Sequence, residues 1–246
     1  MLVAVSGVIG CGKSSLVKGL TTRLGATAFY EPLPGTGNFM LEAYYENPSK
    51  YAFSMQALLL ALRFQTHQEA QWRSARGELC IIDSPITSDR VFLEVQKQCG
   101  YIDDMEYKAY EALASIHYPY LQYPDLQIHI DVDLDTEVNR IKMRSRECED
   151  GIDVSYLSKL NDAYNDLLPH LSRIFPVVHI DGKKDKQAVL EDATKAIIDR
   201  MRGLQAEASG WPCYKKNVGY VPYPSPDSDR SLESNDLKGL AEYLNQ

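Results

Sequence analysis

The residues best suited to do chemistry lie near the amino terminus. Gly7, four intervening residues and the run Gly12-Lys13-Ser14 match the pattern G-x-x-x-x-G-K-S/T of a phosphate-binding loop. A short apolar run, residues 1–5, precedes the pattern, and an amphipathic stretch suited to a helix follows it. This strand-then-helix context is the one that the pattern needs. The sequence therefore predicts a site for a nucleoside triphosphate rather than a glycine-rich turn without a ligand.

Each residue type in this loop suits a bound polyphosphate. Glycines let the backbone turn tightly and direct successive N–H groups at one anion, and the helix that follows adds the positive end of its dipole. Lys13 offers a mobile cation to the β- and γ-phosphates, and the Ser14 hydroxyl is a ligand for Mg²⁺. The residues expected to hold the triphosphate are Gly7, Gly10, Gly12, Lys13, Ser14 and Ser15.

Two carboxylates stand at the ends of apolar, strand-like runs. Asp83 follows residues 79–82, where an acid beside a phosphate loop helps to hold Mg²⁺; the other interpretation is a helix-capping aspartate. Glu31 follows residues 27–30, and a carboxylate there can accept a proton from an attacking hydroxyl. Because ligands gather at the carboxyl ends of the strands in open parallel sheets, we expect both side chains beside the loop.

Three arginines form a basic cluster further along the chain. Arg140 and Arg144 are four residues apart on one predicted helical face, and Arg146 stands where that helix should end. Such spacing is also common on solvated helix faces. Beside a phosphate loop it predicts a mobile lid whose arginines neutralise charge on the transferring phosphoryl group.

The elements that must position these residues alternate along the chain. Strands are predicted at residues 1–5, 27–30, 78–83, 126–132 and 176–181. Helices are predicted at residues 13–24, 39–46, 51–76, 88–98, 103–116, 135–146, 154–174 and 187–201. This alternation predicts an α/β fold, a five-stranded parallel sheet flanked by helices, over residues 1–204. From Gly210 onward, prolines and serines indicate an irregular tail, residues 205–246.

Composition excludes some classes of function. The 246 residues carry a formal net charge of −8, which argues against a nucleic-acid polymer as partner. Five cysteines are an odd number without metal-ligand spacing, and we interpret them as reduced thiols of a cytoplasmic protein. The sequence has no apolar run of membrane-spanning length and no signal peptide before the first strand, so we expect no membrane partner.

Further motifs line up with one family. The chain resembles deoxynucleoside kinases of the deoxycytidine, deoxyguanosine and deoxyadenosine kinase type over most of residues 1–200. The resemblance is carried by the phosphate loop, Glu31-Pro32, Tyr45-Glu46-Asn47-Pro48, Gln56 with Arg63, Ser88-Asp89-Arg90, and Arg140, Arg144, Arg146 and Glu149 followed by Gly151-Ile152. It implies a phosphate-loop kinase with an arginine-bearing lid. The implied reaction moves the γ-phosphoryl group of ATP, with Mg²⁺, to the 5′-hydroxyl of a deoxyribonucleoside.

The resemblance also implies roles in phosphoryl transfer. Glu31 is expected to be the base that accepts the 5′-hydroxyl proton, and Lys13 acts with the three lid arginines on the phosphates. Ser14 and Asp83 are expected to hold Mg²⁺ directly or through water. The segment 182–185, which includes Asp185, falls where the family holds the adenine of the donor.

The acceptor is expected to contact a second group of residues. Gln56 would hydrogen-bond the edge of the nucleobase, Arg63 and Asp89 would pair at the far end of the base pocket, and Met55 and Phe92 would sandwich the base. Taken singly, the two apolar side chains fit an ordinary core equally well.

The sugar and the base preference follow from the same comparison. Tyr45 and Glu149 would grip the 3′-hydroxyl, which needs a donor and an acceptor. Arg63 with Asp89 resembles members that accept deoxyadenosine, deoxyguanosine or deoxycytidine.

One position departs from the family pattern. The family usually has an arginine after the acid at the end of the third strand, and this chain has Asp83-Ser84-Pro85. Three interpretations are open. Another cation, such as Arg90 or a lid arginine, substitutes; the acceptor is a nucleoside monophosphate; or the chain is a nucleotide-binding subunit that has lost catalysis. The family also implies a homodimer, with residues 55–76 and 92–118 as candidate contacts.

Overall fold

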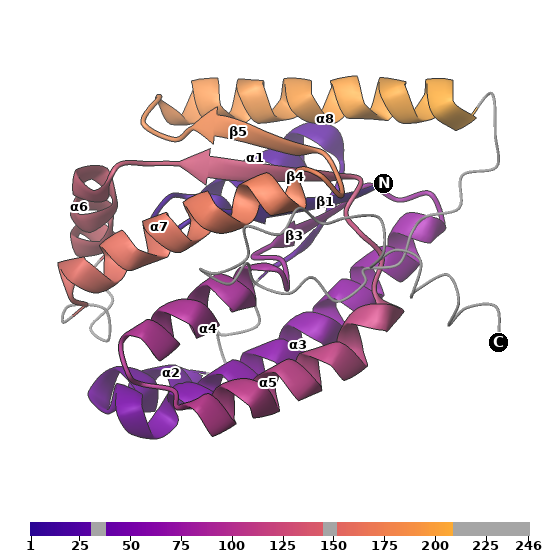
Figure 1. Ribbon diagram of the computed structural model, residues 1–246. Helices are drawn as coiled ribbons and strands as arrows, with labels where there is room; N and C mark the ends of the chain where they lie inside the picture. Colours follow the sequence, from indigo (N-terminus) through magenta and orange to yellow (C-terminus); the bar gives the residue numbers. More distant parts are fainter. Residues whose placement is uncertain (31–37, 145–151, 209–246) are drawn as a thin grey trace, which may run out of the picture.

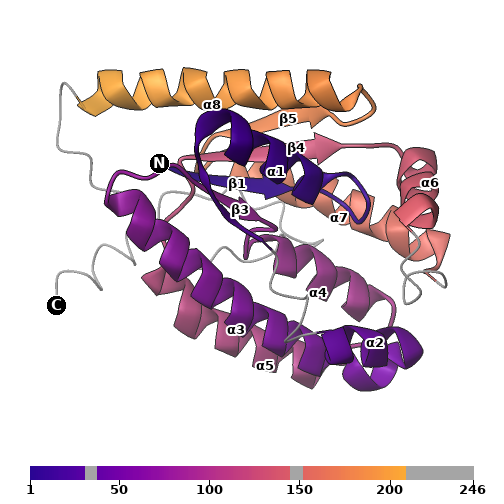
Figure 2. The ribbon, with the colours of Figure 1, turned by 180° about the vertical axis from the view of Figure 1, so that it is seen from behind.

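A computed structural model of the chain shows a parallel sheet between layers of helices (Figures 1 and 2). It describes residues 1–30, 38–144 and 152–208. The strands are β1 (Leu2–Ser6), β2 (Thr27–Phe29), β3 (Cys80–Asp83), β4 (Leu126–Asp131) and β5 (Val177–Asp181). The helices are α1 (Lys13–Leu24), α2 (Asn38–Glu46), α3 (Pro48–Ala75), α4 (Ser88–Gln98), α5 (Asp104–His117), α6 (Leu134–Arg144), α7 (Val154–Leu171) and α8 (Lys186–Ala208), with a short 3₁₀ turn η1 (Tyr118–Tyr120).

The five strands run parallel in the order β2-β3-β1-β4-β5. This arrangement confirms the fold class predicted from the sequence. The carboxyl ends of β1 and β3 are in register, with Val5 opposite Asp83. The phosphate loop and the Asp83 carboxylate therefore leave the same edge of the sheet side by side.

The two faces of the sheet are covered differently. Helices α1 and α8 pack together on one face, while α3, α4 and α7 lie on the other (Figures 1 and 2). Alternate residues of a strand point to opposite faces of the sheet. Because helices cover both faces, all residues of β1 are buried, and its sequence is apolar from Leu2 to Val5. The main core fills the space between the sheet and these helices.

A second apolar cluster lies away from the sheet. It joins α2, α3, α4 and α5 through side chains that include Leu60, Leu93, Tyr110 and Leu121. The cluster fixes the three helices α2, α3 and α4, which carry most of the expected acceptor residues. The neighbouring helix α5 begins at a capping box, in which the Asp103 side chain accepts from the backbone N–H of Glu106.

Some bounds differ from those predicted. Helix α3 begins at Pro48 rather than at residue 51, because Pro48 suits the first helical turn and the Asn47 side chain accepts from the Lys50 backbone. Helix α8 continues to Ala208, beyond residue 201. Residues 209–246 lie outside the described part, so the predicted tail stays a prediction. Among the helices that the structure describes, none is long and apolar enough to cross a membrane.

Candidate active site

A single cavity of about 1150 Å³ joins the carboxyl edge of the sheet to the helices beside it. Its phosphate-loop end is lined by residues of the loop and of α1, α6 and α8, among them Lys13, Ser14 and Arg140. Its helical end is lined by residues of α2, α3, α4 and α7. Those residues are Leu41, Tyr44, Tyr45, Met55, Gln56, Leu59, Arg63, Phe92, Gln96, Tyr156 and Tyr164. The volume exceeds the roughly 300–1,000 Å³ that is usual for a site that holds one drug-sized ligand.

The phosphate loop has a backbone conformation that presents N–H groups to the cavity. Gly7, Gly10 and Gly12 all have positive φ angles. Gly12 is the N-cap of α1 at φ 106°, a left-handed conformation that favours glycine, and no side chain caps the helix. The first N–H groups of α1 are therefore not taken up by a side-chain cap and suit an anion.

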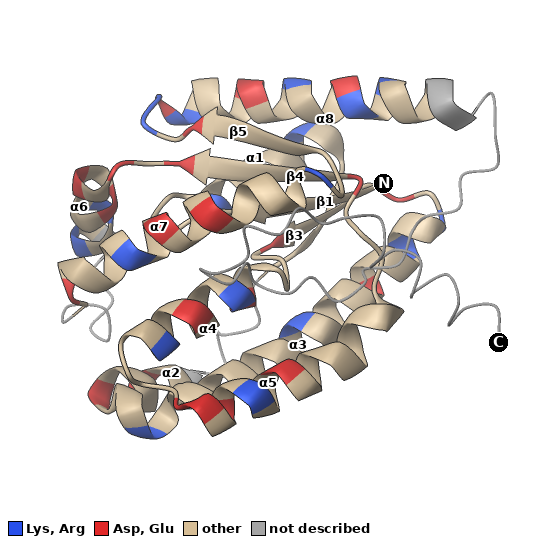
Figure 3. Ribbon diagram, in the orientation of Figure 1, with Lys and Arg blue, Asp and Glu red and all other residues tan. Residues whose placement is uncertain are grey.

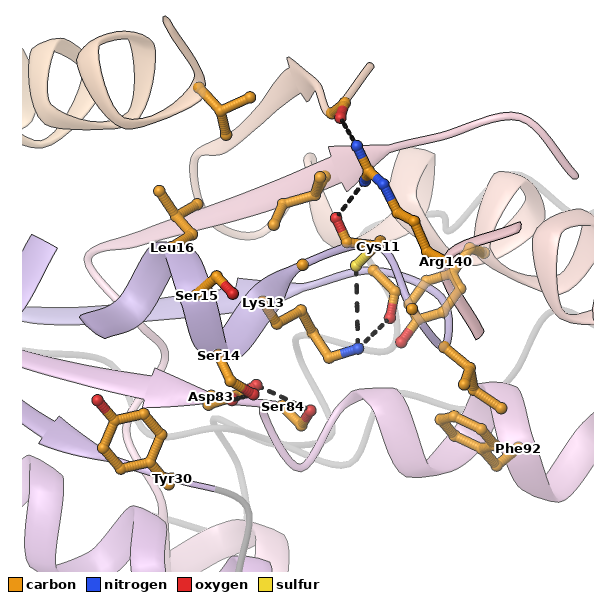
Figure 4. A pocket seen from close by; sticks show the side chains of 18 of the residues that line it. Cys11, Lys13, Ser14, Ser15, Leu16, Tyr30, Asp83, Ser84, Phe92 and Arg140 are labelled. Atoms are coloured by element: carbon orange, nitrogen blue, oxygen red, sulfur yellow. Dashed lines mark hydrogen bonds between the residues drawn. The ribbon is translucent and has the colours of Figure 1, made fainter. Parts of the chain in front are cut away.

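The Lys13 ammonium lies over the loop. It donates to the carbonyl oxygens of Gly7 and Val8, both at 3.0 Å. Figure 4 shows the same nitrogen beside Cys11. The bonds to the carbonyl oxygens hold the cation at the mouth of the loop, where a β- or γ-phosphate would replace them. The buried Cys11 thiol lies 3.9 Å from the same nitrogen, and burial raises the pKa of this thiol. A protonated thiol leaves the charge of Lys13 available to a phosphate.

The expected metal ligands meet beside the loop. The Ser14 hydroxyl donates to Asp83 Oδ2 at 2.6 Å, and Ser84 donates to the other carboxylate oxygen at 3.3 Å (Figure 4). A hydroxyl and a carboxylate are hard oxygen ligands of the kind that Mg²⁺ prefers, together with water and phosphate oxygens. In the described part of the chain no group of three His, Cys, Asp or Glu side chains forms a metal cage. The pair fits a metal that the nucleotide itself helps to bind.

The three arginines predicted to form a lid are described only in part. Arg140 donates to the carbonyl oxygens of Cys11 at 2.9 Å and of Gly182 at 2.7 Å (Figure 4). It therefore fixes α6 between the phosphate loop and the turn after β5. The side chain of Arg144 and all of Arg146 lie outside the described residues, as do Glu31 and Glu149. Their expected roles stay predictions.

The turn after β5 completes the phosphate-loop end. A Cβ at Gly182 would lie 2.5 Å from Ile130 and 2.8 Å from Val132, so only glycine lets this turn approach β4. Asp185 accepts from the backbone N–H groups of Gln187 and Ala188 and caps α8; it does not line the cavity. Its part in donor binding stays a prediction. Lys184, Lys186 and Gln187 do line the cavity, and Figure 3 shows the cluster of basic residues in this turn.

Helix α3 presents a stripe of side chains to the helical end. Met55, Gln56, Leu59 and Arg63 are buried and line the cavity at helical spacing. Arg63 forms an ion pair with Asp89, which is fully buried behind it. The Gln56 Oε1 atom has no hydrogen-bond partner among the described residues. Phe92 of α4 lines the same space, so the apolar walls and the planar amide that the sequence predicted are brought together.

Sequence reasoning missed part of this wall. Tyr44, Gln96 and Tyr156 line the cavity and contact one another, although they come from α2, α4 and α7. A weak signal was present, because Gln96 stands four residues after Phe92 and so on the same face of α4. Tyr45 lies in this wall as expected, with its ring 5.3 Å from that of Tyr44.

A buried carboxylate under the phosphate loop was also missed. Glu137 of α6 is fully buried, and Asn161 of α7 donates to its Oε2 atom at 2.8 Å. Burial raises the pKa of Glu137 to about 7, against the opposing effects of Asn161 and Lys13. Its backbone carbonyl lies 3.3 Å from the position of a Cβ on Gly10, so α6 packs directly on the loop.

The position of the missing arginine is taken by a strained residue. Ser84 has φ 64°, and among the described residues it is the one non-glycine residue with a positive φ. Of the substitutes considered, Arg90 is unsuited, because its guanidinium is buried, bonds Glu111 at 2.6 Å and does not line the cavity. Among the described residues, the basic ones that line the cavity are Lys13, Arg63, Arg140, Lys184 and Lys186.

Comparison with known proteins agrees with this arrangement. A family model described as "Deoxynucleoside kinase" matches residues 3–204. The chain is 35% identical over 179 residues to a deoxyadenosine kinase of Dictyostelium discoideum, covering 73% of this chain and 71% of that one. It is 33% identical over 208 residues to a deoxyguanosine kinase of Lactobacillus johnsonii, covering 80% and 89%. A solved deoxyadenosine kinase from M. mycoides, with the products dCMP and a flexible dCDP bound, superposes with a TM-score of 0.70 at 26% identity, covering 81% of this chain and 100% of that one.

Proposed function

This chain belongs to the deoxynucleoside kinase family, and from that premise we propose how its cavity carries out the reaction. The enzyme transfers the γ-phosphoryl group of ATP to the 5′-hydroxyl of a deoxyribonucleoside and releases the 5′-monophosphate. The observation that carries the proposal is the single cavity in which a phosphate loop faces Gln56, Arg63 and Phe92. The two ends hold donor and acceptor so that the transfer occurs between neighbouring bound groups.

The phosphate-loop end binds and activates the donor. The N–H groups of the loop and the Lys13 ammonium bind the β- and γ-phosphates. Lys13 also stabilises the negative charge that develops during transfer. Ser14 and Asp83 would hold Mg²⁺, which would neutralise phosphate charge when bound. Arg140 keeps α6 against the loop, and Arg144 and Arg146 contribute further positive charge. The turn that contains Gly182 and Asp185 binds the adenine.

The helical end binds the acceptor. Met55 and Phe92 hold the base between them, and Gln56 forms hydrogen bonds with its polar edge. The Arg63–Asp89 pair offers donors and an acceptor at the far end, which suits deoxyadenosine, deoxyguanosine or deoxycytidine. Tyr45 with Glu149 binds the 3′-hydroxyl, and Glu31 accepts the proton of the 5′-hydroxyl as the phosphoryl group arrives.

The proposal extends to assembly and location. Helices α3 and α5 expose large apolar side chains, among them Trp72, Met105 and Ile116, at 61%, 72% and 62% of their surface. We infer that these helices form a homodimer contact, which would cover that surface. The free cysteines Cys11, Cys80 and Cys99 suit the reducing cytoplasm.

One observation favours a second acceptor class. Asp83 and Ser84 both line the cavity, and a short serine in place of a long basic side chain suits an acceptor that brings its own phosphate. A coupled assay with ATP and Mg²⁺ tests both: deoxyadenosine, deoxyguanosine, deoxycytidine and thymidine are compared with their 5′-monophosphates at equal concentration. The proposal expects faster turnover of the nucleosides other than thymidine. Faster turnover of monophosphates would replace it, and ATP binding without transfer to either class would indicate a subunit that has lost catalysis.

A further inference from the structure

The wall of the helical end contains a buried polar group with an unused acceptor. Gln96 of α4 is only 1% exposed, yet it lines the cavity. Its Oε1 atom has no hydrogen-bond partner among the residues that the structure describes. A buried polar atom left without a partner costs about 1–3 kcal/mol, so folded proteins rarely keep one without a ligand or a water to satisfy it.

The amide is held by two phenols from other helices. Hydrogen bonding links the Gln96 side chain to Tyr44 and to Tyr156, and the Tyr44 hydroxyl donates to the Tyr156 hydroxyl at 3.3 Å. Burial raises the pKa of both phenols, so both keep their protons at neutral pH. Three helices far apart in sequence thus fix one amide plane at the cavity wall.

The two ends of the Gln96 amide differ in their partners. The side chain bonds both phenols, while its Oε1 atom bonds none of the described residues. The amide nitrogen is therefore the atom that bonds the tyrosines, and the carbonyl oxygen is left for a partner that enters the cavity. That partner must be an N–H or O–H donor.

We propose that Gln96 is a specificity-determining residue of the acceptor site, whose carbonyl oxygen accepts a hydrogen bond from the bound deoxyribonucleoside. This inference rests on the proposed function, because it takes the helical end as the nucleoside pocket. Apart from the 5′-hydroxyl that reacts, deoxyadenosine offers two kinds of donor there: the exocyclic amino group of the base and the 3′-hydroxyl of the sugar. A pocket built to accept such a bond discriminates strongly against an analogue that lacks the donor.

The test combines one substitution with two truncated substrates. Gln96→Met keeps the length and removes the amide, and Gln98→Met is the matched control, because Gln98 is exposed on the same helix. The kcat/KM and the dissociation constant of each nucleoside are measured for 2′-deoxyadenosine, for purine 2′-deoxyriboside without the amino group, and for 2′,3′-dideoxyadenosine. Turnover of any nucleoside by the unmodified enzyme tests the proposed function separately.

We expect Gln96→Met to lower kcat/KM on deoxyadenosine 10- to 100-fold. On the analogue that lacks the donor, the same substitution should lower kcat/KM threefold or less. The analogue on which the loss shrinks identifies the donor. An equal loss on all three nucleosides, or no loss, would overturn the proposal. Should Gln96→Met fail to fold, Tyr156→Phe keeps Gln96 and removes one of its supports. Tyr156→Phe is expected to lower kcat/KM on deoxyadenosine 3- to 10-fold, and to have a smaller effect on the analogue that lacks the donor. An equal loss of kcat/KM on all three nucleosides would contradict the proposal.

Discussion

The two ends of the cavity are built from different material. At the phosphate-loop end the contacts come largely from backbone: N–H groups of α1, carbonyl oxygens that hold Lys13, and carbonyl oxygens of Cys11 and Gly182 that hold Arg140. At the helical end they come from side chains, and two buried amides, Gln56 and Gln96, have carbonyl oxygens without partners among the described residues.

The difference follows from what each end must recognise. A triphosphate is the same anion whatever base it carries, so a fixed cradle of peptide groups and one lysine is sufficient. An acceptor must be told apart from similar nucleosides, and discrimination requires polar atoms that stay unsatisfied when the wrong molecule enters. Substitutions at the two ends should therefore fail in different ways.

Removing the cation of the phosphate-loop end should have the largest effect. Lys13→Met takes away the ammonium that we propose binds the transferring phosphate, and kcat/KM is expected to fall on the order of 10³-fold. Nucleoside binding, followed by calorimetry, should change little, because Lys13 lies at the other end. Lys18→Met, an exposed substitution on the same helix, is the control. Equal loss of nucleoside binding would show that the two ends are not separable.

Removing an amide of the helical end should produce the opposite pattern. Gln56→Leu removes the amide that we propose bonds the base, and we expect kcat/KM for the nucleoside to fall 10- to 100-fold. The KM for ATP should stay within twofold. Gln68→Leu, exposed on the same helix, provides the comparison. A raised KM for ATP of similar size would contradict the division between the ends.

The third prediction concerns the pH dependence of folding stability at Glu137, which packs against the phosphate loop. Its folded pKa of about 7 lies above the ordinary 4.5, so the folded state holds a proton that the unfolded chain releases. The stability from this group is present below pH 4.5 and is lost as the pH rises to about 7. Glu137→Gln should therefore match the parent near pH 4.5 and exceed it at pH 8, by about 3 kcal/mol at most.

Urea unfolding of the nucleotide-free protein at several pH values measures this difference. Glu69→Gln, which changes an exposed carboxylate, should leave the pH profile unchanged. A Glu137→Gln profile parallel to that of the parent would mean that the buried carboxyl is not the group that titrates.

The smallest expected effect concerns the strained serine at the boundary between the ends. The left-handed backbone at Ser84 costs a non-glycine residue about 1–2 kcal/mol of folding stability. Glycine avoids this cost, but it loses part of the gain because its unfolded chain has more conformational entropy. Ser84→Gly and Ser84→Ala both lose the bond to Asp83, so the pair isolates the backbone. The glycine variant should be more stable by about 1 kcal/mol in thermal unfolding. Equal stability would remove the claim of strain.

Local sequence was sufficient for the phosphate-loop end. The loop, α1 and the strand-end Asp83 follow from short motifs and from apolar runs, because their chemistry depends on neighbours within a few residues and on strand register. The five-stranded parallel sheet was predicted for the same reason: alternating strands and helices of ordinary length leave few ways to cover both faces. Even so, α3 begins three residues before its predicted start, because Asn47 caps it and Pro48 suits its first turn.

By itself the sequence determined the fold class, the phosphate loop and the acid beside it, since these depend on local pattern. Only the tertiary structure decided what stands behind and opposite them: that Arg140 bonds two backbone carbonyls, that Arg90 turns away to Glu111, and that Gln96 meets Tyr44 and Tyr156. Each of these contacts joins residues from different elements. Whether such a side chain is buried, paired or left facing a cavity depends on how helices distant in sequence pack, and no local pattern records that.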